Sequence, residues 1–337
     1  MSRGHGNISV FVPHIGCKNL CSFCNQVFIS GFSGAPTPAD IDSAVRTATA
    51  SKGYNSKTTE LAFFGGSFTA IDRDYRRELL KAGSAYVKNG TVRGIRISTR
   101  PDAVSPDILQ ELLEFSVTAV ELGAQSMDDR VLMLNRRGHT AADVEKAATD
   151  IKSAGIELGL QMMTGLYGDT DEGALNTAKA FIRLNPKTVR IYPTIVLKGT
   201  YLYKLYKQGI YNPQSIEGAV PLCARILEIF YRKDIKVIRL GLHDVDQTEV
   251  AAGPWHPAFG ELCESRLYFN LALAQLKKLP CGRYKIYVNP AAVSKMTGQH
   301  RENIIKLSNI GYDCRIGVDE ALPPYRIEIR KGAQSCF

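Results

Sequence analysis

The sequence lacks the features of membrane proteins, secreted proteins and disulfide scaffolds. No run of eighteen apolar residues occurs in its 337 residues, which argues against a transmembrane helix. The first seven residues are polar and hold no apolar core of a signal peptide. Eight cysteines are too sparse for a disulfide framework in a chain of this length. We therefore expect a cytoplasmic protein with no membrane partner.

Internal repeats, low-complexity tracts and blocks of lysine and arginine are also missing. Hydrophobic residues make up 45% of the chain, enough for a large core, and the length suits one large α/β domain with a smaller appendage. The net charge of +9 favours contact with phosphates and is a weak indication of a nucleic-acid partner. The alternative is a soluble protein whose charge only keeps it in solution.

The first two-thirds of the chain alternates β-rich runs with amphipathic helical segments. Thr37, Ser105 and Thr140 are expected N-caps, the first two followed by proline and the third ending its helix before Gly155. Six βα units in a row predict a parallel sheet. The six β-rich runs are Ile8–Pro13, Glu60–Phe64, Gly94–Ser98, Thr118–Leu122, Ile156–Met163 and Thr188–Tyr192.

Each predicted strand is followed by a polar or glycine-rich motif, which favours a barrel over a flat, doubly wound sheet. In βα-barrels the carboxyl ends of the strands form one face that holds the chemistry. We expect a partial (β/α)6 TIM-like barrel over residues 1–232 and a small α+β C-terminal extension over residues 233–337. Within the extension, strands are expected at Val237–Leu240, Arg283–Val288 and Tyr325–Ile329.

Cys17, Cys21 and Cys24 lie on one short loop after the first predicted strand. Three thiolates without a fourth, in the spacing C-x3-C-x2-C, suit a [4Fe–4S] cluster with one iron open to a small molecule. A zinc site completed by His14 or His5 is the main alternative, and incidental cysteines are the other. The remaining five cysteines show no such spacing and are expected to be buried small side chains.

Other strand ends carry groups suited to binding a ligand. Gly65 and Gly66 let a ligand approach the backbone, although a tight turn explains them as well. Ser98 and Arg100 suit hydroxyls or a carboxylate, with a capped helix start as the alternative. Gln125 adds a neutral donor and acceptor. One further positive group, from Arg136, Arg137 or His139, could pair with a carboxylate of the ligand, with a solvated helix start as the alternative.

The cysteine loop resembles that of the radical S-adenosylmethionine (SAM) enzymes, in which the open iron chelates SAM and one electron cleaves it to a 5′-deoxyadenosyl radical. The resemblance implies that Cys17, Cys21 and Cys24 hold the cluster. It makes Gly65, Gly66, Ser98, Arg100 and Gln125 candidate SAM contacts. Ser67 stands where a glutamate is commoner in that family.

Five phrases together resemble bacterial radical SAM proteins related to the catalytic subunit of Elongator. They are Val12-Pro-His-Ile-Gly-Cys17, Phe63-Phe-Gly-Gly-Ser67, Gly123-Ala-Gln-Ser126, Arg137-Gly-His-Thr140 and Arg190-Ile-Tyr-Pro193. The cysteine spacing is more compact than expected for Elongator, and the chain ends where an acetyltransferase domain would begin, so acetyl-CoA chemistry is not expected.

The resemblance implies reductive cleavage of SAM, and it suggests tRNA as the substrate. The electron would come from a donor such as a flavodoxin or ferredoxin. One alternative is radical chemistry on a small molecule, as in coproporphyrinogen dehydrogenase. The other is a zinc-bearing, RNA-binding protein without redox chemistry.

Overall fold

The computed structural model describes residues 6–12, 17, 21–25, 34–242 and 246–331. The chain divides into two compact units. The larger unit combines residues 2–215 with 230–255, and the smaller combines 216–229 with 256–337. Because the smaller unit takes one helix from the middle of the chain, the division does not follow a single cut in the sequence. The predicted boundary between residues 232 and 233 stays a prediction.

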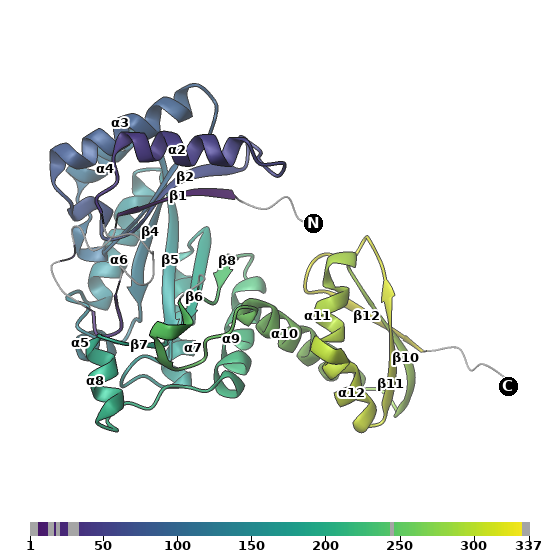
Figure 1. The fold of residues 1–337 in the computed structure, drawn as a ribbon. Coiled ribbons are helices and arrows are strands. Elements are labelled where there is room, and N and C mark those ends of the chain that lie inside the picture. Colours follow the sequence, from purple (N-terminus) through teal and green to yellow (C-terminus); the bar gives the residue numbers. More distant parts are fainter. Residues whose placement is uncertain (1–5, 13–16, 18–20, 26–33, 243–245, 332–337) are drawn as a thin grey trace. The chain divides into compact units, whose positions relative to one another are not determined.

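The larger unit is built on a seven-stranded parallel sheet with the order β1-β2-β3-β4-β5-β6-β8 (Figure 1). The sheet curls into a partial TIM-like barrel, so the predicted fold class is confirmed and a flat, doubly wound sheet is wrong. In-register pairs such as Val10 with Phe63 and Met162 with Ile191 link its neighbouring strands. The strands are β1 (Gly6–Val12), β2 (Thr59–Gly65), β3 (Ile95–Thr99), β4 (Val117–Gln125), β5 (Glu157–Thr164), β6 (Thr188–Pro193) and β8 (Lys236–Leu240).

Strand β8 departs from the prediction, which placed Val237–Leu240 in the extension. It pairs in parallel with β6, matching Val189 to Val237, and so becomes the seventh strand of the barrel sheet. Its pattern is only four residues long and gives no sign of which sheet it joins. Register is set by partners distant in sequence, which a short strand does not reveal by itself.

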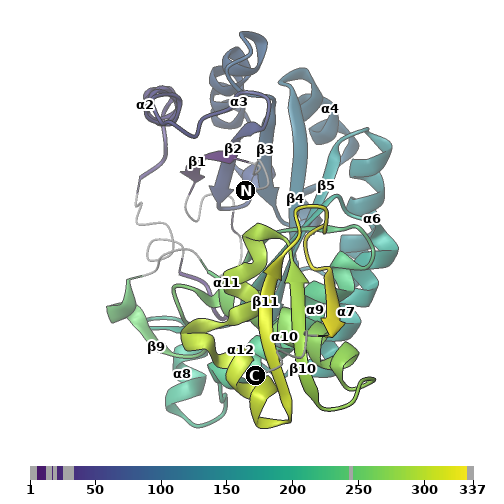
Figure 2. The ribbon, with the colours of Figure 1, turned by 90° about the vertical axis from the view of Figure 1, so that its right-hand side faces the viewer.

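Helices follow the strands and cover the convex side of the sheet (Figures 1 and 2). The N-caps expected at Thr37, Ser105 and Thr140 are confirmed, and Thr37 and Thr140 each form a capping box with an aspartate three residues on. The helices of this unit are α2 (Pro38–Thr49), α3 (Arg73–Lys88), α4 (Pro106–Glu114), α5 (Asp129–Leu134), α6 (Ala141–Ser153), α7 (Asp171–Leu184) and α8 (Tyr201–Lys207). A two-stranded ribbon of β7 (Val196–Leu197) and β9 (Val250–Ala252) completes it.

The barrel strands alternate between two environments. Side chains such as Leu61, Phe63 and Ile97 face the helices and are fully buried and apolar. Their neighbours in the sequence face the concave side and are often polar, as with Glu60 and Arg96. This period of two is the strand pattern. It places a polar lining inside the barrel, beneath its carboxyl-end mouth.

The smaller unit packs helices against one face of a three-stranded sheet of order β11-β10-β12. Tyr268, Leu276, Ile286 and Met296 lie in its core. The elements are α9 (Ile216–Tyr231), α10 (Phe259–Leu276), β10 (Gly282–Val288), α11 (Val293–Thr297), α12 (Glu302–Asn309), β11 (Tyr312–Val318) and β12 (Ile327–Lys331). The predicted α+β character of the extension is confirmed, while β11 was not predicted. Among the described residues, no helix combines the length and apolar character needed to cross a bilayer.

Candidate functional site

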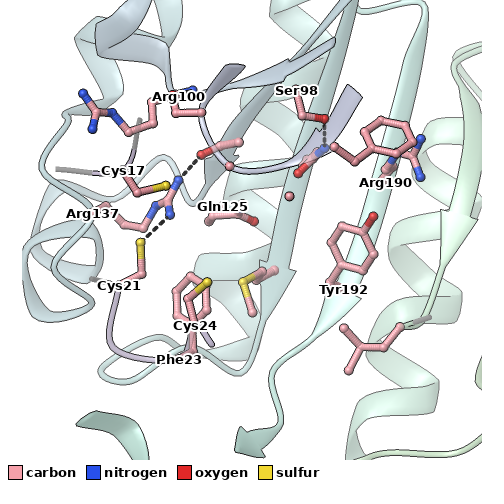
Figure 3. A pocket seen from close by; sticks show the side chains of 18 of the residues that line it. Cys17, Cys21, Phe23, Cys24, Ser98, Arg100, Gln125, Arg137, Arg190 and Tyr192 are labelled. Carbon is pink, nitrogen blue, oxygen red and sulfur yellow. Dashed lines mark hydrogen bonds between the residues drawn. The ribbon is translucent and has the colours of Figure 1, made fainter. Parts of the chain in front are cut away.

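One pocket opens at the carboxyl ends of the barrel strands, and all eight predicted site residues line it (Figure 3). The three cysteines lie on one side of this pocket, and Arg190 and Tyr192 lie on the other. Gln125 lies between the two sides. Phe64, Arg190, Tyr192 and Pro193 belong to phrases that carry the family resemblance, and they line the pocket although they were not predicted as site residues. Further lining residues that were not predicted are Phe11, Thr99, Gln161, Met163, Ile195, Leu197 and Leu242.

The cysteine loop is anchored through Ser22, which is fully buried. The Ser22 hydroxyl donates to Asn135 Oδ1 at 2.8 Å, and its backbone N–H donates to the Asn135 carbonyl at 3.1 Å. Leu202 N–H donates to the Ser22 carbonyl at 2.7 Å. Because each polar group of Ser22 has a partner, the turn from Cys21 to Cys24 is tied to the loop after α5 and to the start of α8.

Arg137 is the cation that joins the cysteines in the pocket. It is 8% exposed, and its Nη1 donates to Cys21 Sγ at 2.8 Å. Its Nη2 donates to the carbonyl of Gly123, and its guanidinium lies 5.9 Å from the centre of the Phe23 ring. Arg136 is exposed and packs instead on the Tyr201 ring. Of the three candidates after Gln125, only Arg137 therefore lines the pocket.

His139 is buried beside this site but does not line the pocket. Its Nε2 lies 3.2 Å from the Ala124 carbonyl, and its Nδ1 has no partner among the described residues. Burial, reinforced by the charge of Arg137, lowers the pKa of His139 to about 4. The imidazole is therefore neutral at pH 7 and supports Ala124 without adding charge to the pocket.

The electrostatics at the cysteines depend on burial and on two guanidinium groups. Burial and the neighbouring Cys21 raise the pKa of Cys17, while Arg100 and Arg137 act in the opposite direction. A metal that binds this thiol must displace its proton. No three Cys, His, Asp or Glu side chains in the described part of the chain converge on a single ion. A four-iron cluster takes each thiolate on a different iron, so its ligands need not converge on one point.

The loop after β2 brings backbone to the pocket. Gly65 adopts a φ of 104°, a conformation that other residues rarely take, and it packs against the backbone of Val12. Ser67 fixes the loop from the other end. Its hydroxyl lies 2.9 Å from that of Thr99 and accepts the N–H of Arg100 at 3.1 Å. In this chain Ser67 therefore holds the glycine loop against the end of β3.

Ser98 and Arg100 are placed differently within the pocket. The Ser98 hydroxyl accepts a hydrogen bond from Gln161 at 3.2 Å and belongs to the concave side of the sheet. Arg100 makes a two-point contact with Asp102, at 2.9 and 3.0 Å. An anionic ligand at Arg100 would therefore share its guanidinium with Asp102.

Gln125 ends β4 in a left-handed conformation, with a φ of 68°, next to an irregularity in the pairing with β5. This turn brings its side chain into the pocket. Its Oε1 is buried and accepts no hydrogen bond from the described residues. A buried acceptor without a donor is unfavourable unless a ligand supplies one. The pocket thus offers thiols, guanidinium groups and an unsatisfied acceptor, a set that fits a sulfur-bound cluster beside a polar ligand.

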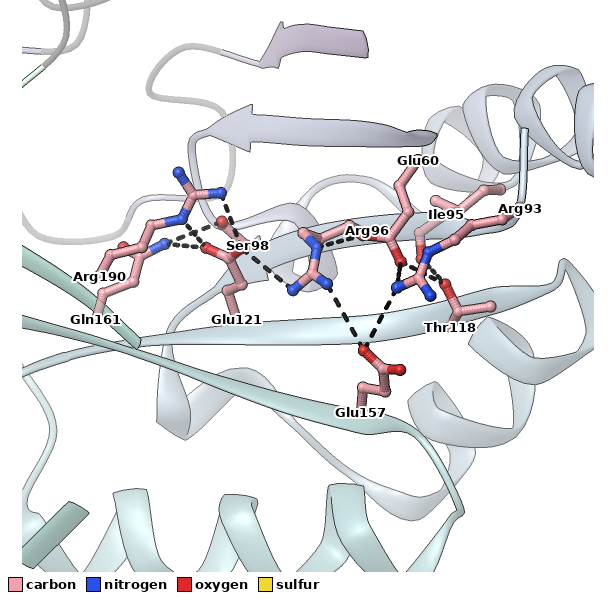
Figure 4. A network of polar contacts seen from close by, with 10 residues as sticks. All are labelled: Glu60, Arg93, Ile95, Arg96, Ser98, Thr118, Glu121, Glu157, Gln161 and Arg190. Atoms are coloured by element: carbon pink, nitrogen blue, oxygen red, sulfur yellow. Dashed lines mark hydrogen bonds and ion pairs between the residues drawn. The ribbon is translucent and has the colours of Figure 1, made fainter. Parts of the chain in front are cut away.

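Beneath the far wall of the pocket lies a network of buried ion pairs (Figure 4). Glu121 accepts from Arg190 Nε at 2.6 Å and from Nη2 at 2.9 Å. Arg96 bridges Glu121 at 3.3 Å and Glu60 at 2.6 Å. Arg93 and Glu157 extend the network at its other end, so three arginines face three glutamates. This balance allows charges to lie inside the barrel.

Arg190 belongs both to the ion-pair network and to the lining of the pocket. It is 5% exposed, and its guanidinium lies 4.8 Å from the centre of the Phe64 ring. Burial by itself would lower the pKa of Arg190, but Glu121 and Tyr192 raise it above its ordinary value. Charged residues in the middle of predicted strands, such as Glu121 and Arg190, were the sequence signal that could have revealed this lining.

A parallel partial barrel with thiols, a glycine loop and polar strand ends at one mouth is the arrangement of a βα-barrel enzyme. The model of the Radical SAM superfamily matches residues 11–181, and that of the Radical_SAM C-terminal domain matches residues 186–268. The chain therefore belongs to the radical SAM superfamily and is an enzyme. Members of this superfamily generally use a [4Fe–4S] cluster and SAM.

Curated proteins show which members of the superfamily this chain resembles in sequence. A tRNA uridine(34) acetyltransferase of Dehalococcoides mccartyi is 30% identical over 222 residues, which cover 57% of this chain and 48% of that protein. Elongator complex protein 3 of Danio rerio is 30% identical over 240 residues, covering 64% and 42%. The chain thus spans about half the length of the curated relatives it matches. This bears out the expected relation to the Elongator catalytic subunit.

Solved structures agree on the fold. The archaeal Methanocaldococcus infernus Elp3 superposes with a TM-score of 0.62 at 23% identity, over 81% of this chain and 62% of that one. SuiB of Streptococcus suis superposes with a TM-score of 0.51 at 13% identity, over 71% and 50%. At these identities the likeness shows the partial barrel alone.

Proposed function

We propose that this enzyme holds a [4Fe–4S] cluster through Cys17, Cys21 and Cys24 and cleaves SAM reductively, with tRNA as the substrate. One observation carries the proposal: the three thiols share a single pocket with every other candidate SAM contact. When bound, the cluster supplies the electron that breaks the carbon–sulfur bond of SAM to give the 5′-deoxyadenosyl radical. The electron itself must come from a donor such as a flavodoxin or ferredoxin.

In this proposal the chain's own residues bind SAM and hold it in position. Gly65 and Gly66 expose backbone to the ligand, and Ser67 holds their loop in place. Gln125 offers its unsatisfied Oε1 to a donor such as a ribose hydroxyl or an amino group. Arg100 offers positive charge to a carboxylate.

The pocket is also suited to exclude water from its chemistry. Phe11, Phe64, Met163, Ile195 and Leu197 give it apolar walls. A carbon radical is preserved only where it has no nearby reactive partner other than its substrate, and closing off water prevents side reactions. The walls therefore support radical chemistry better than they support a structural zinc site.

The tRNA half of the proposal is supported by the relatives and the charge. Proteins about 30% identical to this chain are named tRNA uridine(34) acetyltransferases. The net charge of +9 suits a polyanion. Radical chemistry on a small molecule, as in coproporphyrinogen dehydrogenase, would use the same pocket and differs only in the substrate.

Anaerobic reconstitution with iron and sulfide tests the cluster. We expect about four irons per chain, and release of 5′-deoxyadenosine when dithionite and SAM are added. Cys24→Ala should lose the bound iron and abolish 5′-deoxyadenosine. Cys281→Ala, which removes an exposed cysteine of the smaller unit, is the matched control and should retain both. Stoichiometric zinc without iron, or full turnover in Cys24→Ala, would contradict the proposal.

The substrate is tested separately. The nucleosides of tRNA from a strain lacking this gene should differ from those of the wild type in one modified nucleoside, measured by liquid chromatography and mass spectrometry. Identical nucleoside profiles, with cluster chemistry intact in the purified enzyme, would reject tRNA as the substrate. Small-molecule radical chemistry would then be the surviving candidate.

A further inference from the structure

The sheet of the smaller unit has one face covered by helices and one that is not. Strand β10 lies between β11, which is parallel to it, and β12, which is antiparallel. Tyr284, Ile286 and Val288 point into the core beneath the helices. By the alternation of strands, Arg283, Lys285 and Tyr287 point to the opposite face. No helix or strand of the described part of this unit covers that face.

Three cations lie in one row across this uncovered face. Lys285 is in register with Arg315 on β11 and with Arg330 on β12. All three side chains belong to exposed residues. Like charges directly opposite one another on neighbouring strands are unfavourable. A row of three therefore works against stability, and such violations of local rules are expected at functional sites.

The charge of the row is only partly compensated. Arg330 pairs with Glu328 at 2.8 Å, and nearby Arg283 lies 3.5 Å from Asp313. Lys285 and Arg315 make no ion pair with any described residue. Four cations thus face two carboxylates on this side of the sheet, and the uncompensated charge lies at its centre.

An aromatic ring lies beside the row. Tyr287 is in register with Gly317, and a methyl group added to Gly317 would lie 2.7 Å from the Tyr287 ring. The ring therefore occupies space above β11 that only glycine leaves open. The Arg330 guanidinium lies over the ring at 4.3 Å from its centre and the Lys285 ammonium at 5.1 Å, so the ring and two cations of the row pack together.

We propose that this face binds a single-stranded segment of RNA, with a base stacking on the Tyr287–Arg330 pair while Lys285 and Arg315 contact phosphates. Bases that are not paired expose faces that stack on aromatic side chains, and cations follow the backbone. A partner that offered negative charge alone would not account for an aromatic ring packed among the cations. The inference rests on the proposed function, which makes tRNA the substrate.

The test measures binding of a fluorescent single-stranded RNA of about ten nucleotides to the full chain, over a salt series. The triple variant Lys285→Ala, Arg315→Ala and Arg330→Ala should bind more weakly. Its slope of log affinity against log salt should be shallower by about 1.4, because two phosphate contacts are lost. The control variant Lys81→Ala, Lys88→Ala and Lys146→Ala removes the same charge from exposed helix positions and should bind like the wild type.

A second pair of variants isolates stacking. Tyr287→Leu should reduce affinity by roughly five- to 150-fold without changing the salt slope, while Tyr287→Phe should retain affinity. A structural role for the row would appear as a lower melting temperature in the triple variant. We expect the melting temperature to rise or stay unchanged, because repulsion across the strands is relieved.

The outcomes separate this inference from the proposed function. If the wild type binds RNA and the triple variant binds equally well, the face is not the RNA site and the proposed function stands. If the wild type binds no single-stranded RNA at any salt concentration, this inference fails, whereas the proposed function is still decided by the iron content, 5′-deoxyadenosine release and tRNA nucleosides. Equal affinity for a fully paired duplex, with no effect of Tyr287→Leu, would overturn single-strand recognition.

Discussion

Two polar regions lie inside the barrel, and they differ in how well their groups are satisfied. On the far side of the pocket, the carboxylates of Glu60 and Glu121 are surrounded by guanidinium groups at 2.6–3.3 Å. Elsewhere in the pocket, Gln125 Oε1 and Arg137 Nε are buried without partners among the described residues, as is Nδ1 of His139 beside it. A complete network fixes a structure, whereas an incomplete one indicates a place for ligands.

The two buried polar regions have different roles, one in holding the sheet together and the other in binding a ligand. The ion pairs join strands β2, β3, β4 and β6, so they hold the register of the sheet. Gln125 and Arg137, which carry two of the unsatisfied atoms, line the pocket together with the cysteines. Substitutions in the two regions should therefore separate stability from ligand binding. The expected loss of stability is largest for Glu121, smaller for His139 and smallest for Gln125.

Glu121→Gln should destabilise the protein most. The change leaves Arg96 and Arg190 buried with less negative charge, and breaking such a pair costs about 3–5 kcal/mol. Urea unfolding of the purified protein measures the loss. Glu157→Gln is the control, since its contacts lie at 3.6 and 3.7 Å and its side chain is 38% exposed, so a change within about 1 kcal/mol is expected. Equal losses in both variants would remove the distinction between the two regions.

His139 should make stability depend on pH. Its pKa of about 4 in the folded protein lies below the ordinary value of 6.5, so the unfolded chain takes up the proton first as the pH falls. Its contribution to the free energy of unfolding is complete above pH 6.5 and is lost as the pH falls towards 4, and the loss reaches roughly 2 kcal/mol at pH 5.

Unfolding measured from pH 7 to pH 5 should show this slope in the wild type and a flatter one in His139→Gln. His300→Asn, which removes an exposed histidine, should keep the slope of the wild type. The same slope in His139→Gln would mean that other groups cause it.

Gln125→Met should change stability least and ligand binding most. The substitution removes a buried acceptor without a partner, so the free energy of unfolding should stay the same or rise by about 1 kcal/mol. Affinity for SAM, measured by calorimetry on the reconstituted protein, should fall by roughly tenfold for one lost hydrogen bond. Gln161→Met is the contrasting change. It removes bonds to Ser98 and Glu121 and should lower stability instead. A stability loss in Gln125→Met as large as that in Gln161→Met would contradict the comparison.

The parts of the fold that could be predicted were those determined locally. The N-cap chemistry of Thr37, Ser105 and Thr140 depends on a few adjacent residues and was read correctly. The convergence of Gly65, Ser98 and Gln125 followed from one topological rule, because parallel strands end at the same mouth. Their roles as SAM contacts stay predictions.

The parts that could not be predicted depend on partners distant in the sequence. Arg136 and Arg137 are adjacent and chemically identical, and only the left-handed turn at Arg136 sends one to the Tyr201 ring and the other to Cys21. Arg96 finds its carboxylates 36 and 25 positions away in the sequence. Strand β8 was separated from its sheet for the same reason, because its neighbour is chosen by the packed sheet.

The anchor between Ser22 and Asn135 has a consequence for how the enzyme matures. The two residues are 113 positions apart, so the thiol-bearing turn has no fixed shape until half the barrel has assembled around it. If the three cysteines hold the cluster as proposed, iron delivered earlier would meet thiols that are close in the sequence but lack the arrangement of the folded loop. Cluster loading should then come late in maturation, and the iron content of a preparation should report the fraction of molecules that have completed their tertiary structure.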